Sequence, residues 1–172
     1  MSLIVAYFWR SGISPTFTGI IGTEGRILFP EIQIPSSLPT MLDDYREGSF
    51  TPTIIGTTTE GVGTYTTRTG TFTKIGRRVF YDLFVEWSTH DGTGAMRITG
   101  LPYTSGNACC TTWHRNLTLA ANNVLLANHL IINNLLVISL SQVPIGGGSP
   151  QSAVFMDTTG GIMISGTYLT TN

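Results

Sequence analysis

The residues that could perform acid–base, nucleophilic or metal chemistry are few and scattered. The three histidines, His90, His114 and His129, have no partner at the spacing of a metal site. No Gly-x-Ser-x-Gly nucleophile motif occurs in the chain. Cys109 and Cys110 are neighbours, and because a disulfide between adjacent residues is strained, we interpret both as small buried hydrophobic residues. The sequence therefore predicts no metal site, no redox pair and no catalytic nucleophile.

Two further patterns resemble chemical sites but are better explained as a turn and a connecting loop. Asp43, Asp44 and Glu47 are clustered carboxylates, and glycosidases use two carboxylates about 5–9.5 Å apart. Arg46 lies among them, however, and the segment is typical of a turn. The glycines of residues 146–148 lack the Lys-Ser/Thr that follows in a phosphate loop, so they predict a connecting loop. We expect no catalytic residue and no cofactor, and hence a protein that is not an enzyme.

The composition excludes several classes of protein. Of the 172 residues, 11% are charged, against roughly 25% in average globular proteins. The nine basic residues are scattered, which argues against nucleic-acid binding. The chain has 41% hydrophobic residues and a net charge of −1, unlike a disordered protein, and no apolar run of about 18 residues that would insert into a membrane. The surface must instead be rich in the 27 threonines and 20 glycines, and a net charge near zero favours association.

The clearest element is a strand predicted over residues 79–88, in which apolar residues alternate with a period of two. One face is fully apolar, and consists of Val79, Tyr81, Leu83, Val85 and Trp87. The other face is only half polar, because it carries Phe80 and Phe84 beside Asp82, Glu86 and Ser88. We expect Phe80 and Phe84 to be covered by a loop or by a neighbouring subunit.

Short strands separated by turn residues continue along the chain and predict an all-β fold, an antiparallel β-sandwich of jelly-roll type. The other predicted strands are residues 50–55, 65–67, 71–75, 95–99, 111–119 and 162–169. Residues 116–143 fit either a helical stripe or two strands, and we favour two strands because Asn133-Asn134 suits a two-residue hairpin turn.

The first part of the chain differs from the rest. Pro30, Pro35 and Pro39 stiffen it into extended segments, and an aromatic run precedes them at Tyr7, Phe8 and Trp9. We predict that residues 1–40 form an extended attachment and oligomerisation segment, with Tyr7, Phe8 and Trp9 as attachment residues. Residues 41–172 then form the knob domain.

A series of ordered motifs carries a family resemblance. The blocks are Phe29-Pro30, then Leu42-Asp43-Asp44-Tyr45-Arg46-Glu47-Gly48-Ser49-Phe50-Thr51-Pro52, then Phe72-Thr73-Lys74-Ile75-Gly76, then Ile98-Thr99-Gly100-Leu101-Pro102. This series resembles a domain common at the C-terminal ends of tail fibres, spikes and other virion structural proteins of tailed bacteriophages, and the resemblance covers about residues 28–105. Residues 164–168 are also similar to the last strand of that family.

The motif residues have physical roles of their own, all of them structural. Asp43, Asp44 and Gly48 suit a turn or cap, and we expect Tyr45 to anchor it in the core. In the second block, we expect Ile75 beside Lys74 to face inward and Gly76 to turn the chain.

The resemblance implies a bacteriophage virion protein that assembles as a homotrimer at the particle surface. Two functions are consistent with it: a tail fibre or spike knob that adheres to a glycan or protein of the host surface, and a decoration, cement or head-fibre protein that binds the capsid lattice. The expected partners are other copies of the chain and other virion proteins, the latter through the N-terminal segment. Tyr103 and Trp113 are the aromatic residues that we expect to contact a receptor.

Overall fold

The computed structural model describes residues 20–21, 27–28, 44–104, 109–132, 135–146 and 152–170. Every regular element in these ranges is a β-strand, and none of them contains a helix that could cross a membrane. A separate pair consists of β1 (Ile20–Ile21) and β2 (Ile27–Leu28), which are antiparallel. The other strands are β3 (Tyr45–Phe50), β4 (Thr53–Gly56), β5 (Gly63–Ile75), β6 (Arg78–His90), β7 (Met96–Thr99), β8 (Cys109–Arg115), β9 (Asn123–Ile132), β10 (Leu135–Pro144), β11 (Ser152–Ala153) and β12 (Gly160–Leu169).

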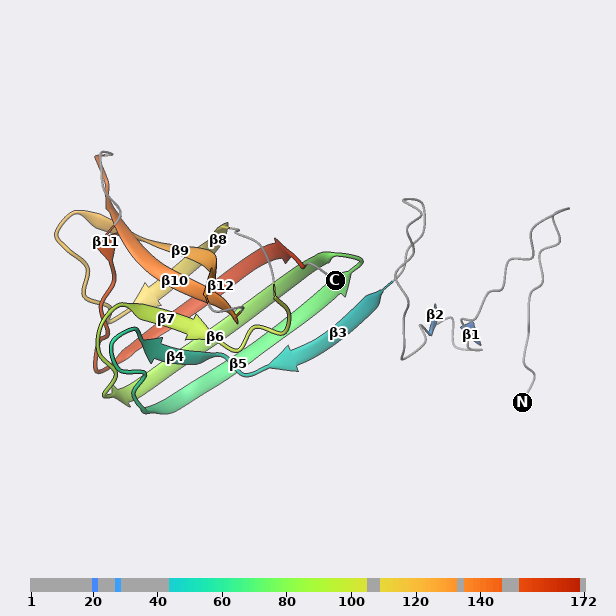
Figure 1. Cartoon of the computed structure of the whole chain (residues 1–172), viewed down its shortest axis with the longest axis horizontal. Helices are drawn as coiled ribbons and strands as arrows, with labels where there is room; N and C mark the ends of the chain where they lie inside the picture. Colours follow the sequence, from blue (N-terminus) through green and yellow to red (C-terminus); the bar gives the residue numbers. More distant parts are fainter. Residues whose placement is uncertain are drawn as a thin grey trace, which may run out of the picture.

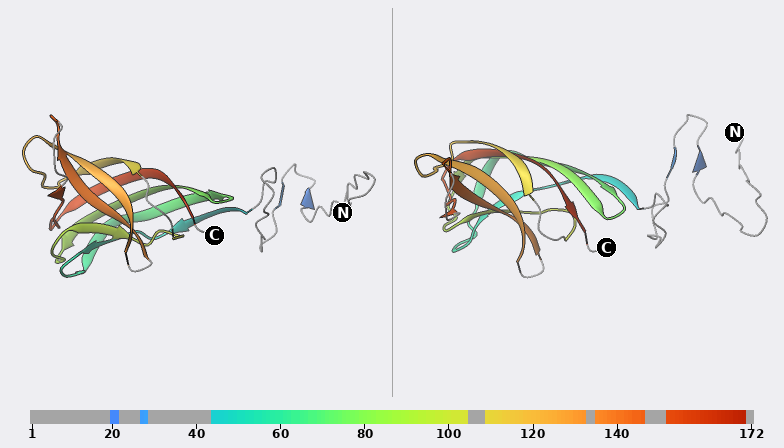
Figure 2. Two further views of the ribbon diagram at one scale, coloured as in Figure 1. Left: turned by 45° about the horizontal axis from the view of Figure 1, so that its top comes forward. Right: turned by 90° about the horizontal axis from the view of Figure 1, so that it is seen from above.

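Strands β3 to β12 join one continuous antiparallel sheet in the order β3-β5-β6-β12-β8-β9-β10-β7-β4, with β11 paired to β10. The sheet curls like part of a barrel, so that β9 and β10 run obliquely across from β5 and β6 (Figures 1 and 2). The all-β antiparallel prediction is confirmed. The two-sheet sandwich and the jelly-roll order are not confirmed, because the described strands belong to one curled sheet rather than to two stacked ones.

Several strand predictions are confirmed in detail. Strand β6 buries the five residues of its apolar face and leaves Phe80 45% exposed. The two strands predicted within residues 116–143 are β9, which begins at Asn123, and β10, and their last pair, Ile132 with Leu135, flanks Asn133-Asn134 as a two-residue hairpin requires. The break predicted between residues 67 and 71 is wrong, because β5 runs through as one strand with register shifts near Tyr65. The predicted domain boundary at residue 40 lies outside the described residues.

The core fills the inside of the curl with side chains from both of its halves. Ile54, Ile98 and Ile138 pair across β4, β7 and β10 and form one fully buried row. This row belongs to a single buried cluster with the inner faces of β6 and β12, to which Val85 and Ile162 contribute as a cross-strand pair. A row of cross-strand contacts from each half therefore stabilises the curled shape.

Strand β4 is the last strand of the sheet, and side chains satisfy its outer edge. The hydroxyl of Tyr65 accepts a hydrogen bond from the Ile54 amide at 3.2 Å and donates one to the Ile54 carbonyl at 3.4 Å. The buried ring of His90 also lies 3.2 Å from that carbonyl through Nε2, and its Nδ1 accepts from the Gly92 amide at 3.0 Å. His90 therefore donates through Nε2. Tyr65 and His90 together bind the backbone amide and carbonyl of Ile54, which another strand could otherwise pair with.

The long strands run between two distinct ends of the domain. One end holds Asp44 at the start of β3, the turn between β5 and β6, and Thr170 after β12 (Figure 1). The opposite end holds the connections β4–β5 and β6–β7, joined by hydrogen bonds such as Thr58 N to Thr93 O at 3.0 Å. The residues that precede Asp44 in the sequence therefore join the domain at the end away from these connections.

Two buried tyrosines predict a loss of stability at alkaline pH. Burial raises the pKa of Tyr81 and of Tyr168, whose rings lie 5.8 Å apart, whereas an unfolded tyrosine titrates near pH 10. Above pH 10 the unfolded chain releases protons that the folded chain retains, so the free energy of unfolding is fully present below pH 10 and falls as pH rises beyond it. The fall is up to about 1.4 kcal/mol per pH unit and per tyrosine.

Urea unfolding between pH 8 and pH 11 measures this effect. We expect Tyr81→Phe to make the decline above pH 10 shallower than in the parent chain. Equal slopes for the two proteins would contradict the role of Tyr81.

Candidate functional site

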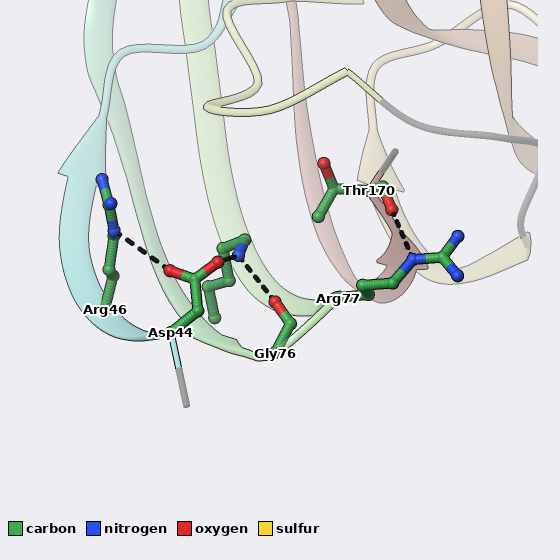
Figure 3. Close-up of polar contacts among 6 residues, drawn as sticks. Asp44, Arg46, Gly76, Arg77 and Thr170 are labelled. Carbon is green, nitrogen blue, oxygen red and sulfur yellow. Dashed lines mark hydrogen bonds and ion pairs between the residues drawn. The ribbon is translucent and has the colours of Figure 1, made fainter. Parts of the chain in front are cut away.

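The first motif residues meet in a buried ion pair at the start of β3. Lys74 is only 2% exposed, and its amine donates to the Asp44 carboxylate and, at 2.6 Å, to the carbonyl of Gly76. Arg46 Nε lies 3.2 Å from the second oxygen of Asp44, as Figure 3 shows. Tyr103 completes the group, since its ring centroid lies 5.5 Å from the Lys74 amine. We call Asp44, Arg46, Lys74, Gly76 and Tyr103 the junction cluster.

Local backbone geometry places these groups. Asp44 has a φ of +53°, a left-handed conformation that Asp and Asn tolerate better than most residues. Gly76 has a φ of +55° and is the first residue of the two-residue turn between β5 and β6, where glycine is favoured. The Gly76 amide donates to the Asp44 carbonyl at 3.2 Å, so the turn and the start of β3 are held to each other by backbone as well as by charge.

The junction cluster also connects to the end of β12. The Thr170 amide donates to the Arg77 carbonyl at 2.8 Å, and Arg77 Nε donates to the Thr170 carbonyl at 3.2 Å (Figure 3). The start of β3, the β5–β6 turn and the end of β12 are therefore fixed together, at the end of the domain where residues 1–43 join.

The other motif residues occupy β3 itself rather than a turn. Gly48 lies opposite Phe72, and a side chain at Gly48 would place its Cβ 2.8 Å from the Phe72 ring, so glycine is needed for this close approach. Tyr45 donates to the carboxylate of Glu47, and this hydrogen bond raises the pKa of Tyr45. The expectation that Tyr45 anchors in the core is wrong, because it lies on the outer side of β3. Asp43 lies outside the described residues.

The structure also corrects the expected orientation at the end of β5. Ile75 is 39% exposed and does not face inward. Strand alternation places either Lys74 or Ile75 inside, and the paired amine of Lys74 takes the inner position. Sequence reasoning missed this because a lysine is rarely buried unless it is paired, and its partner Asp44 lies thirty residues earlier.

The carboxylates that the sequence offered for catalysis and that the structure describes, Asp44 and Glu47, bind neighbouring side chains. Asp44 is bound by two cations, and Glu47 accepts from Tyr45. Among the described residues, no group of three or more His, Cys, Asp or Glu side chains could hold a metal ion. His114 lies half-buried in β8, and the sulfur of Cys110 donates to the Ala127 carbonyl at 3.3 Å. The arrangement at the junction cluster holds the charges of Asp44, Lys74 and Arg46 in place.

The outer side of the sheet presents a second feature, an apolar row in which one side chain is half-buried and two are exposed. Phe84, Met163 and Trp113 are direct cross-strand neighbours on β6, β12 and β8. Met163 is 47% and Trp113 51% exposed. We call these three residues the outer row. In the next row of cross-strand neighbours, Arg115 forms an ion pair with Glu86 across Gly161, and this pair flanks the outer row on the side away from the junction cluster.

The two predicted receptor-contact residues have different environments. Tyr103 is half-buried, with its ring 5.5 Å from Phe72 in an edge-on contact, in addition to its place over Lys74. Trp113 is open on the outer face. Receptor contact stays a prediction for both. The attachment residues Tyr7, Phe8 and Trp9 lie outside the described residues.

Comparison with known proteins supports the fold. No family model and no curated protein matches the chain. Among solved structures, the chain is similar to the Dettilon tailspike protein (gp208), with a TM-score of 0.53 and 22% sequence identity over 72% of this chain. The matched region spans 23% of the tailspike chain, so this curled sheet resembles one part of a larger protein.

The junction cluster generates a stability prediction. Replacing Lys74 by Met leaves the Asp44 carboxylate buried without its main partner, which we expect to lower the free energy of unfolding by about 3–5 kcal/mol. The double variant Lys74→Met with Asp44→Asn removes the stranded charge and is expected to recover part of the loss. Chemical denaturation of the three proteins measures the difference.

Arg46→Met is the matched control, because Arg46 pairs with the same carboxylate from an exposed position. We expect it to cost no more than about 1 kcal/mol. A Lys74→Met loss as small as that of Arg46→Met would show that the buried pair does not hold the junction.

Proposed function

We propose that the protein is a bacteriophage virion structural protein, a trimeric knob of tail fibre or spike type that adheres to the host surface. The observation that carries this proposal is the fold, since it is similar to a region of a protein described as a tailspike. The ordered motifs in residues 28–105 point in the same direction, and the junction cluster accounts for several of them structurally.

The placement of the junction supports an attached knob. Residues 1–43 join the sheet at Asp44, beside the β5–β6 turn and the end of β12. A buried ion pair at this point holds the start of β3 in place. The connections at the opposite end then lie far from the point where the attachment segment joins, which suits contact with a distant surface.

Binding rather than cleavage suits the described side chains. The surface offers threonine hydroxyls and few charges, and the Asp44 carboxylate at the junction is paired with Lys74 and Arg46. Several weak contacts, one set from each copy, would add up through effective concentration.

Competition with the phage tests the adhesive function. Purified full-length protein at saturating dose is expected to reduce adsorption of the phage to intact host cells and to leave the capsule of those cells undegraded. Binding to empty capsids without any competition would overturn adhesion and support the capsid-decoration alternative. Loss of capsule on treatment would instead show a depolymerase.

A further inference from the structure

The outer face of β5, β6, β12 and β8 carries several exposed apolar side chains. The outer row crosses it, and Phe80 (45% exposed) and Leu169 extend it toward the junction end. Hydroxyl side chains such as Ser165 and Thr111 fill the space between them. Single exposed apolar residues are ordinary, but three adjoining apolar residues in a cross-strand row, with Phe80 and Leu169 on the same face, indicate an interaction surface.

The composition of this face is that of a protein interface. Trp, Phe, Met and Arg are enriched at the centres of protein–protein interfaces, whereas Lys is depleted. The face has Trp113, Met163, Phe84 and Arg115, and the chain's one lysine, Lys74, is buried on the inside. A face of four strands with about eight residues each projects roughly 400–500 Å². Each partner in a standard interface contributes ~800 Å² of accessible surface, which exceeds the projected area of the contact because side chains protrude.

The charges on the face point to a second copy of the chain as its occupant. The four charged residues of this face are Arg78, Asp82, Glu86 and Arg115, two of each sign. Glu86 and Arg115 already compensate each other. A surface that meets its own copies must avoid like-charge repulsion, and this one has no net charge: Asp82 lies in the row next to the outer row, and Arg78 lies two rows further toward the junction end. A strongly charged partner would find no complementary field here.

We propose that copies of this chain assemble through the outer face, with the outer row of each copy turned toward the threefold axis and packed against its neighbours. This inference rests on the trimer of the proposed function and assigns its interface. It places Trp113 between subunits instead of against a receptor. Phe80 and Phe84 were expected to be covered by a loop or by a neighbouring subunit, and this interface would cover them with a neighbouring subunit.

Light scattering on the full chain across a range of concentrations tests the interface. The unaltered protein is expected to have three times the 18.6 kDa of one chain, and Met163→Asp, which places a carboxylate in the middle of the outer row, is expected to shift it to 18.6 kDa by weakening assembly about 30-fold or more. Val62→Asp is the matched control, because Val62 is an apolar residue that is 78% exposed in the β4–β5 connection at the other end. It is expected to leave the assembly intact.

A second measurement uses Trp9→Phe, which leaves Trp87 and Trp113 as the tryptophans of the chain. Quenching of its tryptophan fluorescence by acrylamide is expected to increase when the protein is diluted below its assembly range, because Trp113 becomes exposed while Trp87 stays in the core. A parent chain that stays at 18.6 kDa at every concentration, or a trimer that Met163→Asp leaves intact, would overturn the proposed interface.

The outcomes separate this inference from the proposed function. A protein that assembles through the outer face and does not compete for host cells retains the interface and loses adhesion. One that competes as a monomer retains adhesion and loses the interface.

Discussion

The buried amine of Lys74 imposes the strongest constraint on the described part of the chain. A lysine held inside a β-domain must find an anion and further acceptors, or the cost of removing its charge from water is uncompensated. Asp44 and the Gly76 carbonyl supply both. To do so, the start of β3 must lie against the β5–β6 turn, and the turn must accept a left-handed glycine. One charge pair therefore fixes the strand that begins the sheet and the hairpin beside it.

The curl of the sheet depends on this same fixed beginning. Strands β3 and β4 are consecutive in the chain but stand at opposite ends of the strand order. The sheet must therefore bend round until β4 approaches β5, where the Tyr65 hydroxyl bonds to both peptide groups of Ile54. The Tyr65 side chain thus bridges β5 and β4, which do not pair through backbone hydrogen bonds. It protects β4 as an edge strand although the sheet does not close into a barrel.

Local patterns in the sequence were sufficient for much of the fold. Alternation in β6 identified its buried face, and Asn133-Asn134 between apolar runs identified the β9–β10 hairpin, because both signals lie within a few residues. The burial of Lys74 and the formation of the outer row were not accessible in this way. Each depends on which residues face one another from distant strands, and a shift of one residue in register would separate Met163 from Trp113.

The low charge of the chain is consistent with these long-range contacts. A sheet with one face in the core needs polar residues on the other, yet β6, β8 and β12 place Phe, Trp and Met there and leave threonine and serine around them. The strands run from the junction end to the β4–β5 and β6–β7 connections, so copies that met on this face about an axis along the strands would carry those connections at one common end. The features that make the outer face suitable for self-association would then also bring the surfaces opposite the junction together, where multivalent adhesion needs them.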